Sequence, residues 1–332
     1  MVRSYGFSIT GSSHESKGTK CQDANKVCKL ENGTVIAAVA DGVGSCKYAD
    51  VASQIAVDVA TAFCEEKLKT EPAICVDVKL LEEAFSQAEL AIEKQSLNDD
   101  EPLSEYDTTL DLVVYDGKRV VYGHCGDGGT IGLTVKGDYV KITTPQKNEG
   151  IFVVPLRNGS KNKNNTWEFG CVENDLVSVL LATDGVHDIF FPYLLKGQPV
   201  EVYVPLIRYF MDNTGIHVSE DTIEKISEAR EAFINSSDCK SITDDKTLLV
   251  LINEDIIPER KDDSYYAEPD WDALKLEWDK KAYPHLYGKQ EVADMENIEG
   301  PKGEAITQED PPVEEAETPS VTDTVKKLLG LE

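Results

Sequence analysis

Several aspartates stand where apolar, strand-like runs end and the chain must turn. Asp41 follows TVIAAVA, Asp127 follows RVVYGHC after one glycine, and Asp184 follows LVSVLLA after one threonine. In all three cases the next residue is glycine. Asp244 and Asp245 precede the last such run, KTLLVLIN. A strand end holds a carboxylate more firmly than a free loop does, so these side chains are candidates for a fixed site.

Clustered carboxylates suit hard divalent cations. Mg²⁺ and Mn²⁺ prefer carboxylate, carbonyl and water oxygens, and two such ions about 3.5–4 Å apart can activate a water against a phosphoryl group. Gly42 lets the backbone turn sharply after Asp41, so its carbonyl is a further candidate ligand. The alternative is that each Asp-Gly pair is only a turn, as the hairpin-like sequence around Asp116 and Gly117 predicts there. Spacing alone does not decide between these interpretations.

Charge and composition exclude several other classes of protein. The 61 acidic against 33 basic residues give a formal net charge of −28, which repels nucleic-acid backbones and anionic membranes, so we expect neither as a partner. The first residues do not have the pattern of a signal peptide, a basic start followed by an apolar stretch. No apolar run reaches the length of a transmembrane helix. None of the eight cysteines forms a Cys-x-x-Cys pair, so we expect reduced thiols and a cytoplasmic location.

The charge density changes near residue 253. Residues 254–332 hold 22 acidic and 9 basic side chains, a composition that buries little apolar surface. We predict a folded domain over 1–253 and an acidic, partly disordered tail over 254–332. Two parts of the tail differ, an aromatic segment at 265–287 and a short amphipathic segment at the end, and either suits docking to a protein partner or back onto the domain. The apolar residues of the terminal segment are Val325, Leu328, Leu329 and Leu331.

Groups of strands alternate with long helices in the predicted element order. Apolar stripes predict helices at 49–68 and 78–97, and two more are expected at 200–211 and 220–234. Strands are expected at 34–40, 110–115, 118–123, 130–135, 139–143, 176–183 and 247–252. Because hairpins join the strands and strand–helix units do not repeat, we predict an α+β fold, a four-layer α-β-β-α sandwich with two central antiparallel sheets flanked by helices.

Six segments in this order resemble the type 2C family of metal-dependent serine/threonine protein phosphatases, and its bacterial branch in particular. They are TKCQDAN, VADGVGS, DTTL, GHCGDGGT, LATDGVHD and DDKTLLVL, within roughly residues 5–253. The resemblance implies the same sandwich fold. It also implies hydrolysis of phosphoserine and phosphothreonine on proteins by a water bridged between two Mn²⁺ or Mg²⁺ ions. A phosphorylated protein substrate and a cognate kinase are the partners to expect.

Site residues follow from the resemblance by position. Asp41 would bridge both cations, with the Gly42 carbonyl as a neighbouring ligand. Asp184 and Asp244 would bind the ion farther from Gly42, and Asp127 matches the acid of a third, weaker site.

Further matched positions support these ligands. Asp23 resembles the catalytic acid that orients the attacking water. Thr108 and Thr109 match a hydroxyl pair on a core strand, and Asp188 matches an acid that starts a helix. Asp245 stands where the family often has Asn.

The phosphate-binding position departs from the family's pattern. Gly18 stands where the family generally has an arginine. His14, Lys17 and Lys20 are nearby candidates to bind phosphate, although lysine is a point charge without the fork of arginine. The alternative for His14 is a solvated side chain in a polar loop.

Two more departures bear on the competing functions. Gln22 replaces a frequent acid, and Val43 replaces the histidine of many eukaryotic members, as in many bacterial ones. One alternative to an active phosphatase is therefore a catalytically weak, phosphatase-like regulatory or binding module. Another is an acidic interaction protein in which the tail carries the function.

Overall fold

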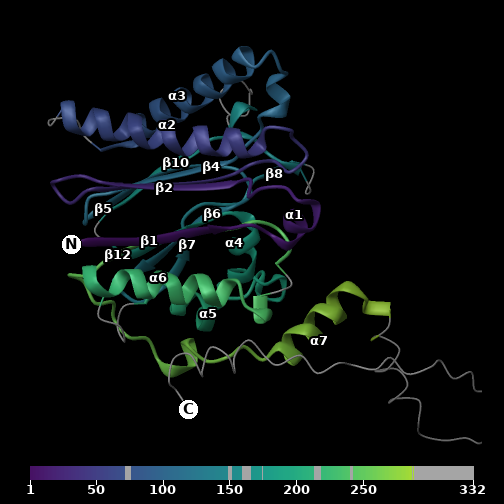
Figure 1. Cartoon of the computed structure of the whole chain (residues 1–332). Helices are drawn as coiled ribbons and strands as arrows, with labels where there is room; N and C mark the ends of the chain where they lie inside the picture. The colour runs from purple at the N-terminus through teal and green to yellow at the C-terminus, as the bar shows by residue number, and fades with distance from the viewer. Residues whose placement is uncertain are drawn as a thin grey trace, which may run out of the picture.

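The computed structural model describes residues 1–71, 76–148, 152–158, 166–173, 175–212, 218–239, 242–285 and 287. Figure 1 shows two sheets at the centre of the molecule, with helices on both outer faces. The predicted disordered stretch and the terminal amphipathic segment lie beyond residue 287, outside the described residues.

Both central sheets are five-stranded and antiparallel. The first has the order β1-β12-β11-β6-β7 and the second the order β10-β5-β4-β3-β2. The strands of the first sheet are β1 (Val2–Ile9), β6 (Gly129–Thr134), β7 (Tyr139–Lys141), β11 (Leu176–Ala182) and β12 (Lys246–Asn253). Those of the second are β2 (Asp23–Lys29), β3 (Val35–Asp41), β4 (Leu110–Tyr115), β5 (Arg119–Cys125) and β10 (Glu168–Glu173). A separate short hairpin pairs β8 (Lys147–Asn148) with β9 (Phe152–Val153).

The sheets are covered on both faces, which explains why their central strands are mainly apolar. Side chains alternate between the faces of a strand. In β3, Val35, Ala37 and Val39 belong to the core between the sheets, while Ile36 and Ala38 belong to the core under the helices. A polar residue on either face would therefore be buried, and the run TVIAAVA has none after its first residue.

Helices form the outer layers (Figure 1). α2 (Ala49–Thr70) and α3 (Val78–Asn98) cover the second sheet, and α2 approaches it through small buried residues such as Ala52 and Ala56. The first sheet is covered by α4 (Asp184–Phe190), α5 (Val204–Met211) and α6 (Glu220–Ile234). The predicted α-β-β-α sandwich is confirmed.

The largest departures from the predicted elements are short or edge elements. The prediction lacks β1, β2 and β10 as well as α1 (Ser12–Lys17), α4 and α7 (Trp271–Ala282). The helix expected at 200–211 begins only at Val204, because Pro205 favours the first turn of a helix. Asp188 was expected to start a helix, and this is wrong: α4 begins at Asp184, and the side chain of Asp188, inside it, is 69% exposed.

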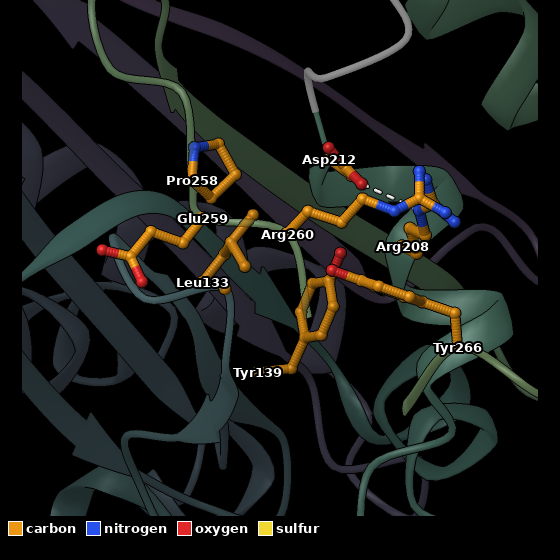
Figure 2. A pocket seen from close by; sticks show the side chains of 9 residues that line it. Leu133, Tyr139, Arg208, Asp212, Pro258, Glu259, Arg260 and Tyr266 are labelled. Carbon is orange, nitrogen blue, oxygen red and sulfur yellow. Dashed lines mark hydrogen bonds and ion pairs between the residues drawn. The ribbon is translucent and has the colours of Figure 1, made fainter. Parts of the chain in front are cut away.

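The aromatic segment after β12 packs onto the first sheet's outer layer. Tyr265, Tyr266 and Trp271 are half-buried against that core, and the Tyr139 N–H donates to the Tyr265 hydroxyl at 2.9 Å. Figure 2 shows the cavity at this junction, where the Arg208 guanidinium lies 4.5 Å from the centre of the Tyr266 ring. This part of the predicted tail is thus built into the fold. No helix among the described residues has the length and apolar character needed to cross a bilayer.

Candidate metal centre

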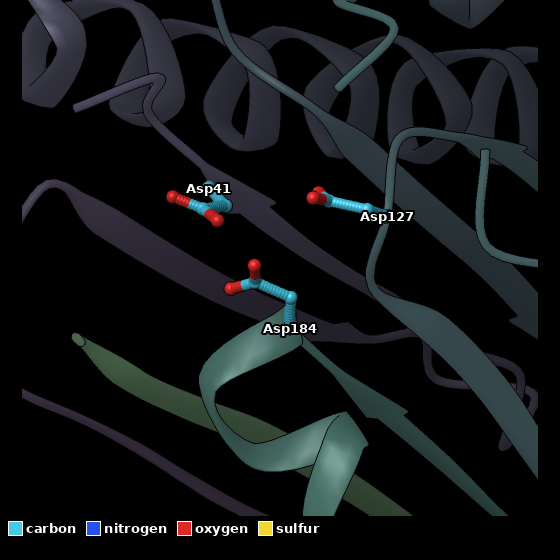
Figure 3. A group of neighbouring side chains, drawn as sticks. All are labelled: Asp41, Asp127 and Asp184. Atoms are coloured by element: carbon cyan, nitrogen blue, oxygen red, sulfur yellow. The ribbon is translucent and has the colours of Figure 1, made fainter. Parts of the chain in front are cut away.

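Three aspartates from three different elements meet at one end of the sandwich. Asp41 ends β3, Asp127 follows β5 by two residues, and Asp184 begins α4. Each offers a carboxylate oxygen, and these oxygens all lie within 4.8 Å of one another. Figure 3 shows the three side chains converging on a common space.

Two threonines fix the backbone of Asp41. The Asp41 N–H donates to the Thr109 hydroxyl at 2.8 Å. The Asp41 carbonyl accepts from the Thr109 N–H at 2.8 Å and from the Thr108 hydroxyl at 2.9 Å. The hydroxyl pair predicted on a core strand therefore lies immediately before β4 and holds the strand end that carries Asp41.

The glycines after Asp41 and Asp184 allow backbone segments to approach closely. A β-carbon on Gly42 would lie 2.4 Å from the Ala49 carbonyl oxygen, and one on Gly185 would lie 2.2 Å from the Asp245 carbonyl oxygen. Real β-carbons do not approach so near, so no other residue fits without movement of the backbone. These Asp-Gly pairs therefore do more than turn the chain, whereas Asp116 and Gly117 form the hairpin between β4 and β5 that was predicted.

A cavity of about 330 Å³ opens over the three carboxylates. Asp244 lines this cavity but does not belong to the tight cluster of Asp41, Asp127 and Asp184. Lys20 is not among the described residues that line it. The lining residues are Ser13, His14, Lys17, Asp41, Gly42, Val43, Gly44, Thr109, Asp127, Val153, Asp184, Thr243 and Asp244.

Asp23 lies behind the cluster. It is buried, directly opposite Asp41 in the β2–β3 pairing, and its carboxylate accepts from the Thr183 hydroxyl at 2.8 Å. Thr183 is the N-cap residue of α4, yet its side chain makes no capping bond. The hydroxyl is committed to Asp23, so β2 and the start of α4 are joined at the site.

The electrostatics of these carboxylates favour a bound cation. Burial raises the pKa of Asp23 to about 7, with the Thr183 hydrogen bond opposing the shift and the charge of Asp245 adding to it. Burial also raises the pKa of Asp41 well above its ordinary value, and the charges of Asp23 and Asp184 raise it further. Mutually repelling buried carboxylates are stabilised by a compensating positive charge, and an all-oxygen donor set suits Mg²⁺ or Mn²⁺. The residues present therefore fit divalent cations.

Gly18, at the position of the family arginine, ends helix α1. Its φ of 68° is left-handed, and its N–H donates to the Glu15 carbonyl at 3.0 Å. A left-handed C-cap favours glycine, so the local backbone accounts for the loss of the arginine. Of the candidates nearby, His14 and Lys17 line the cavity.

Asp245 organises the segments around the side of the cavity that His14 lines. Its carboxylate accepts from the backbone N–H groups of Gly11 and Gln22, both at 2.6 Å. His14 Nδ1 lies 2.9 Å from the same carboxylate, and the His14 side chain is only 12% exposed. The solvated alternative for His14 is therefore wrong. This positioning role of Asp245 was not predicted from the sequence, although a second aspartate just before a buried strand was a visible signal.

Comparison with known proteins places the chain in a family. A family model described as protein phosphatase 2C matches residues 10–221. The chain belongs to the protein phosphatase 2C family, as the resemblance predicted. Comparison with curated protein sequences gave no match.

Several solved bacterial enzymes share the fold. Serine/threonine phosphatase Stp1 from Staphylococcus aureus is 16% identical, with a TM-score of 0.52 over 76% of this chain and 95% of its own. The catalytic domain of the phosphatase PstP, solved with two manganese ions, is 18% identical, with a TM-score of 0.51 over 76% and 97%. A bacterial serine phosphatase is 15% identical, with a TM-score of 0.54 over 79% and 100%. At these identities the likeness concerns the fold.

Proposed function

We propose that this chain is a metal-dependent protein serine/threonine phosphatase that uses two Mn²⁺ or Mg²⁺ ions. The observation that carries the proposal is the meeting of Asp41, Asp127 and Asp184 within 4.8 Å beneath a cavity that Lys17 also lines. Residues 1–253 would supply the catalytic machinery. The substrate would be a phosphorylated protein, and a kinase acting on the same protein would be the natural counterpart.

Each carboxylate has a part in this proposal. Asp41 would bridge the two cations, with the Gly42 carbonyl beside it. Asp184 and Asp244 would bind the second cation, and Asp127 would serve a third, weaker site. When bound, the cations would supply an activated water and neutralise the phosphoryl oxygens.

The remaining residues handle the proton and the phosphate. Asp23, which lies opposite Asp41 in the β2–β3 pairing and behind the cluster, would orient the attacking water. Lys17 would contribute a positive charge to the substrate phosphate, and His14 would form part of the same wall. Lys20 is the weakest of the three phosphate-binding candidates, because it lies outside the cavity lining.

The substitution Asp41→Asn tests the proposal. We expect the variant to fold, by circular dichroism, and to lose Mn²⁺-dependent hydrolysis of p-nitrophenyl phosphate and of a phosphothreonine peptide. Asp116→Asn, in the β4–β5 turn, is the matched control and should keep full activity. Turnover at the wild-type rate in Asp41→Asn would reject the assignment.

A catalytically weak regulatory module is the second candidate, and Gly18 in place of arginine favours it. Calorimetry with Mn²⁺ combined with phosphopeptide turnover distinguishes the two functions. Tight metal binding with turnover supports the phosphatase. Tight metal binding without turnover of phosphoserine, phosphothreonine or phosphotyrosine peptides supports the module.

A further inference from the structure

Helix α7 is an amphipathic helix with little cover. It lies against the 3-10 turn Tyr193–Leu195, at the periphery of the molecule (Figure 1). None of its residues is buried, although it carries Trp271, Leu274 and Trp278. Trp278 is 40% exposed and Leu276 46% exposed. A helix with this much exposed apolar surface is suited to a further contact.

An apolar groove runs between α7 and the segment before α5. Its volume is about 410 Å³. Three prolines in its walls have no backbone N–H to offer a strand, so the groove suits side chains of a helix rather than strand addition. The lining residues are Leu195, Gln198, Pro199, Val200, Val202, Val204, Pro205, Ser264, Tyr265, Ala267, Glu268, Pro269, Asp270, Ala273, Leu274 and Glu277.

The charged side chains that line the groove are acidic. Glu268, Asp270 and Glu277 line it, and none of the described lining residues is basic. The Glu268 carboxylate accepts from the Tyr203 hydroxyl at 2.9 Å and from the Trp271 indole at 2.6 Å, so it stays fixed at the mouth. The groove therefore favours an apolar ligand that also carries positive charge.

The end of the chain has this chemistry. The sequence SVTDTVKKLLG at 320–330 combines a capping pattern, Ser320 with Asp323, and a terminal glycine, which together predict a short helix. Its apolar positions follow helical spacing, with Lys326 at the side of the apolar face and Lys327 on the opposite side of the helix. The apolar positions are Val321, Val325, Leu328 and Leu329.

The chain length favours this segment over a free partner. About 30 residues separate it from residue 287, and a flexible linker of that length has an end-to-end distance of about 30 Å. Helix α7 is about 18 Å long, so the segment reaches the groove easily. Tethering gives an effective concentration of order mM, which a second copy of the chain at micromolar concentration does not match.

We propose that residues 320–330 dock as a short helix in the groove between α7 and residues 195–205, with Leu328 and Leu329 in the groove and Lys326, at the side of the apolar face, nearest to its acidic rim. The contact is intramolecular and closes the acidic tail into a loop. It is independent of the metal centre, so it stands or falls separately from the proposed phosphatase activity.

Hydrogen–deuterium exchange on the full-length chain tests the docking. In the wild type we expect slowed exchange at 320–330 and in α7. The double substitution Leu328→Asp/Leu329→Asp should speed exchange in both regions at least fivefold. Thr307→Asp/Gln308→Asp, in the linker, makes the same change of charge and should leave both unchanged.

A second variant changes the groove and leaves the sequence of the tail as it is. Ala273→Arg fills the groove and should release protection at 320–330, whereas Ala282→Arg, at the end of α7 outside the groove, should not. Equal exchange of 320–330 in wild type and Ala273→Arg overturns the proposal. Protection that rises with protein concentration also overturns it, because a second copy would then be the occupant.

Discussion

In the proposed phosphatase, Lys17 would take the place of the missing arginine. Its side chain lines the cavity while Lys20 does not. We expect Lys17→Ala to lower kcat/KM by about tenfold or more, since a hydrogen bond to a charged group contributes about 1.5–3 kcal/mol. Lys20→Ala is the control and should change kcat/KM little. Steady-state kinetics on a phosphothreonine peptide measures both, and equal effects from the two substitutions would contradict the role of Lys17.

The raised pKa values of Asp23 and Asp41 predict a pH-dependent stability of the metal-free protein. Both groups bind protons more tightly in the folded state than in the unfolded state. Between the ordinary aspartate pKa and about 7 the folded state therefore holds more protons, and stability falls as pH rises through this window. In EDTA we expect a higher Tm at pH 5 than at pH 7.5, measured by differential scanning fluorimetry.

Two comparisons isolate this effect from the titration of other acids. Asp23→Asn should flatten the pH dependence of Tm, because one of the shifted groups is gone. Mn²⁺ should raise Tm more at pH 7.5 than at pH 5, since ionised carboxylates bind it better. A Tm difference that Asp23→Asn leaves intact would place its origin elsewhere in this acidic chain.

At the scale of elements, Gly185 sets how closely α4 approaches the segment before β12. A β-carbon there meets the Asp245 carbonyl oxygen, so we expect Gly185→Ala to destabilise the fold by about 1–3 kcal/mol, the usual cost of overpacking. It should also weaken Mn²⁺ binding by moving Asp184. Gly44→Ala is the control for stability only, since Gly44 also lines the cavity; a β-carbon there would have its nearest neighbour 3.6 Å away. Urea unfolding and calorimetry test both variants.

The elements that the sequence predicts well are those covered on both faces. β4, β11 and β12 are buried along their whole length, and β3 in all but its last residue, so their sequences are mainly apolar. β2, at the edge of its sheet, is exposed or half-exposed over most of its length, and its sequence DANKVCK carries no clear period. Helix α4 has only seven residues, too few to establish a helical pattern.

The candidate site could be predicted as a set of residues but not as a geometry. Strand ends and the family resemblance selected Asp41, Asp127 and Asp184, which the fold brings together. From the sequence, Asp244 was predicted to be a main metal ligand and Asp127 to belong to a third, weaker site. In the structure Asp127 is in the tight cluster and Asp244 is not. Distances between segments depend on sheet order and register, which local sequence does not specify.

At the scale of the whole molecule, the residues after β12 belong to the folded unit. Tyr265, Tyr266 and Trp271 pack against the first sheet's outer core. We expect a chain ending at residue 253 to have a Tm lower by at least about 5 °C, since about 1 kcal/mol shifts Tm by 2–4 °C at this size. A chain ending at residue 287 should show a much smaller change. Equal Tm values for the two truncated chains would show instead that the folded domain ends at residue 253, as the sequence predicts.

The pairing of β1 with β12 places Val2 opposite Asn253. During synthesis, the N-terminal strand must therefore wait for a partner that leaves the ribosome about 250 residues later, and such distant pairing is slow to form. Asp245, which ties down Gly11 and Gln22, emerges with that late strand. A nascent or prematurely terminated chain accordingly lacks the Asp245 carboxylate that fixes Gly11 and Gln22 beside the cavity. The cavity wall is therefore complete only after the last strand has been synthesised.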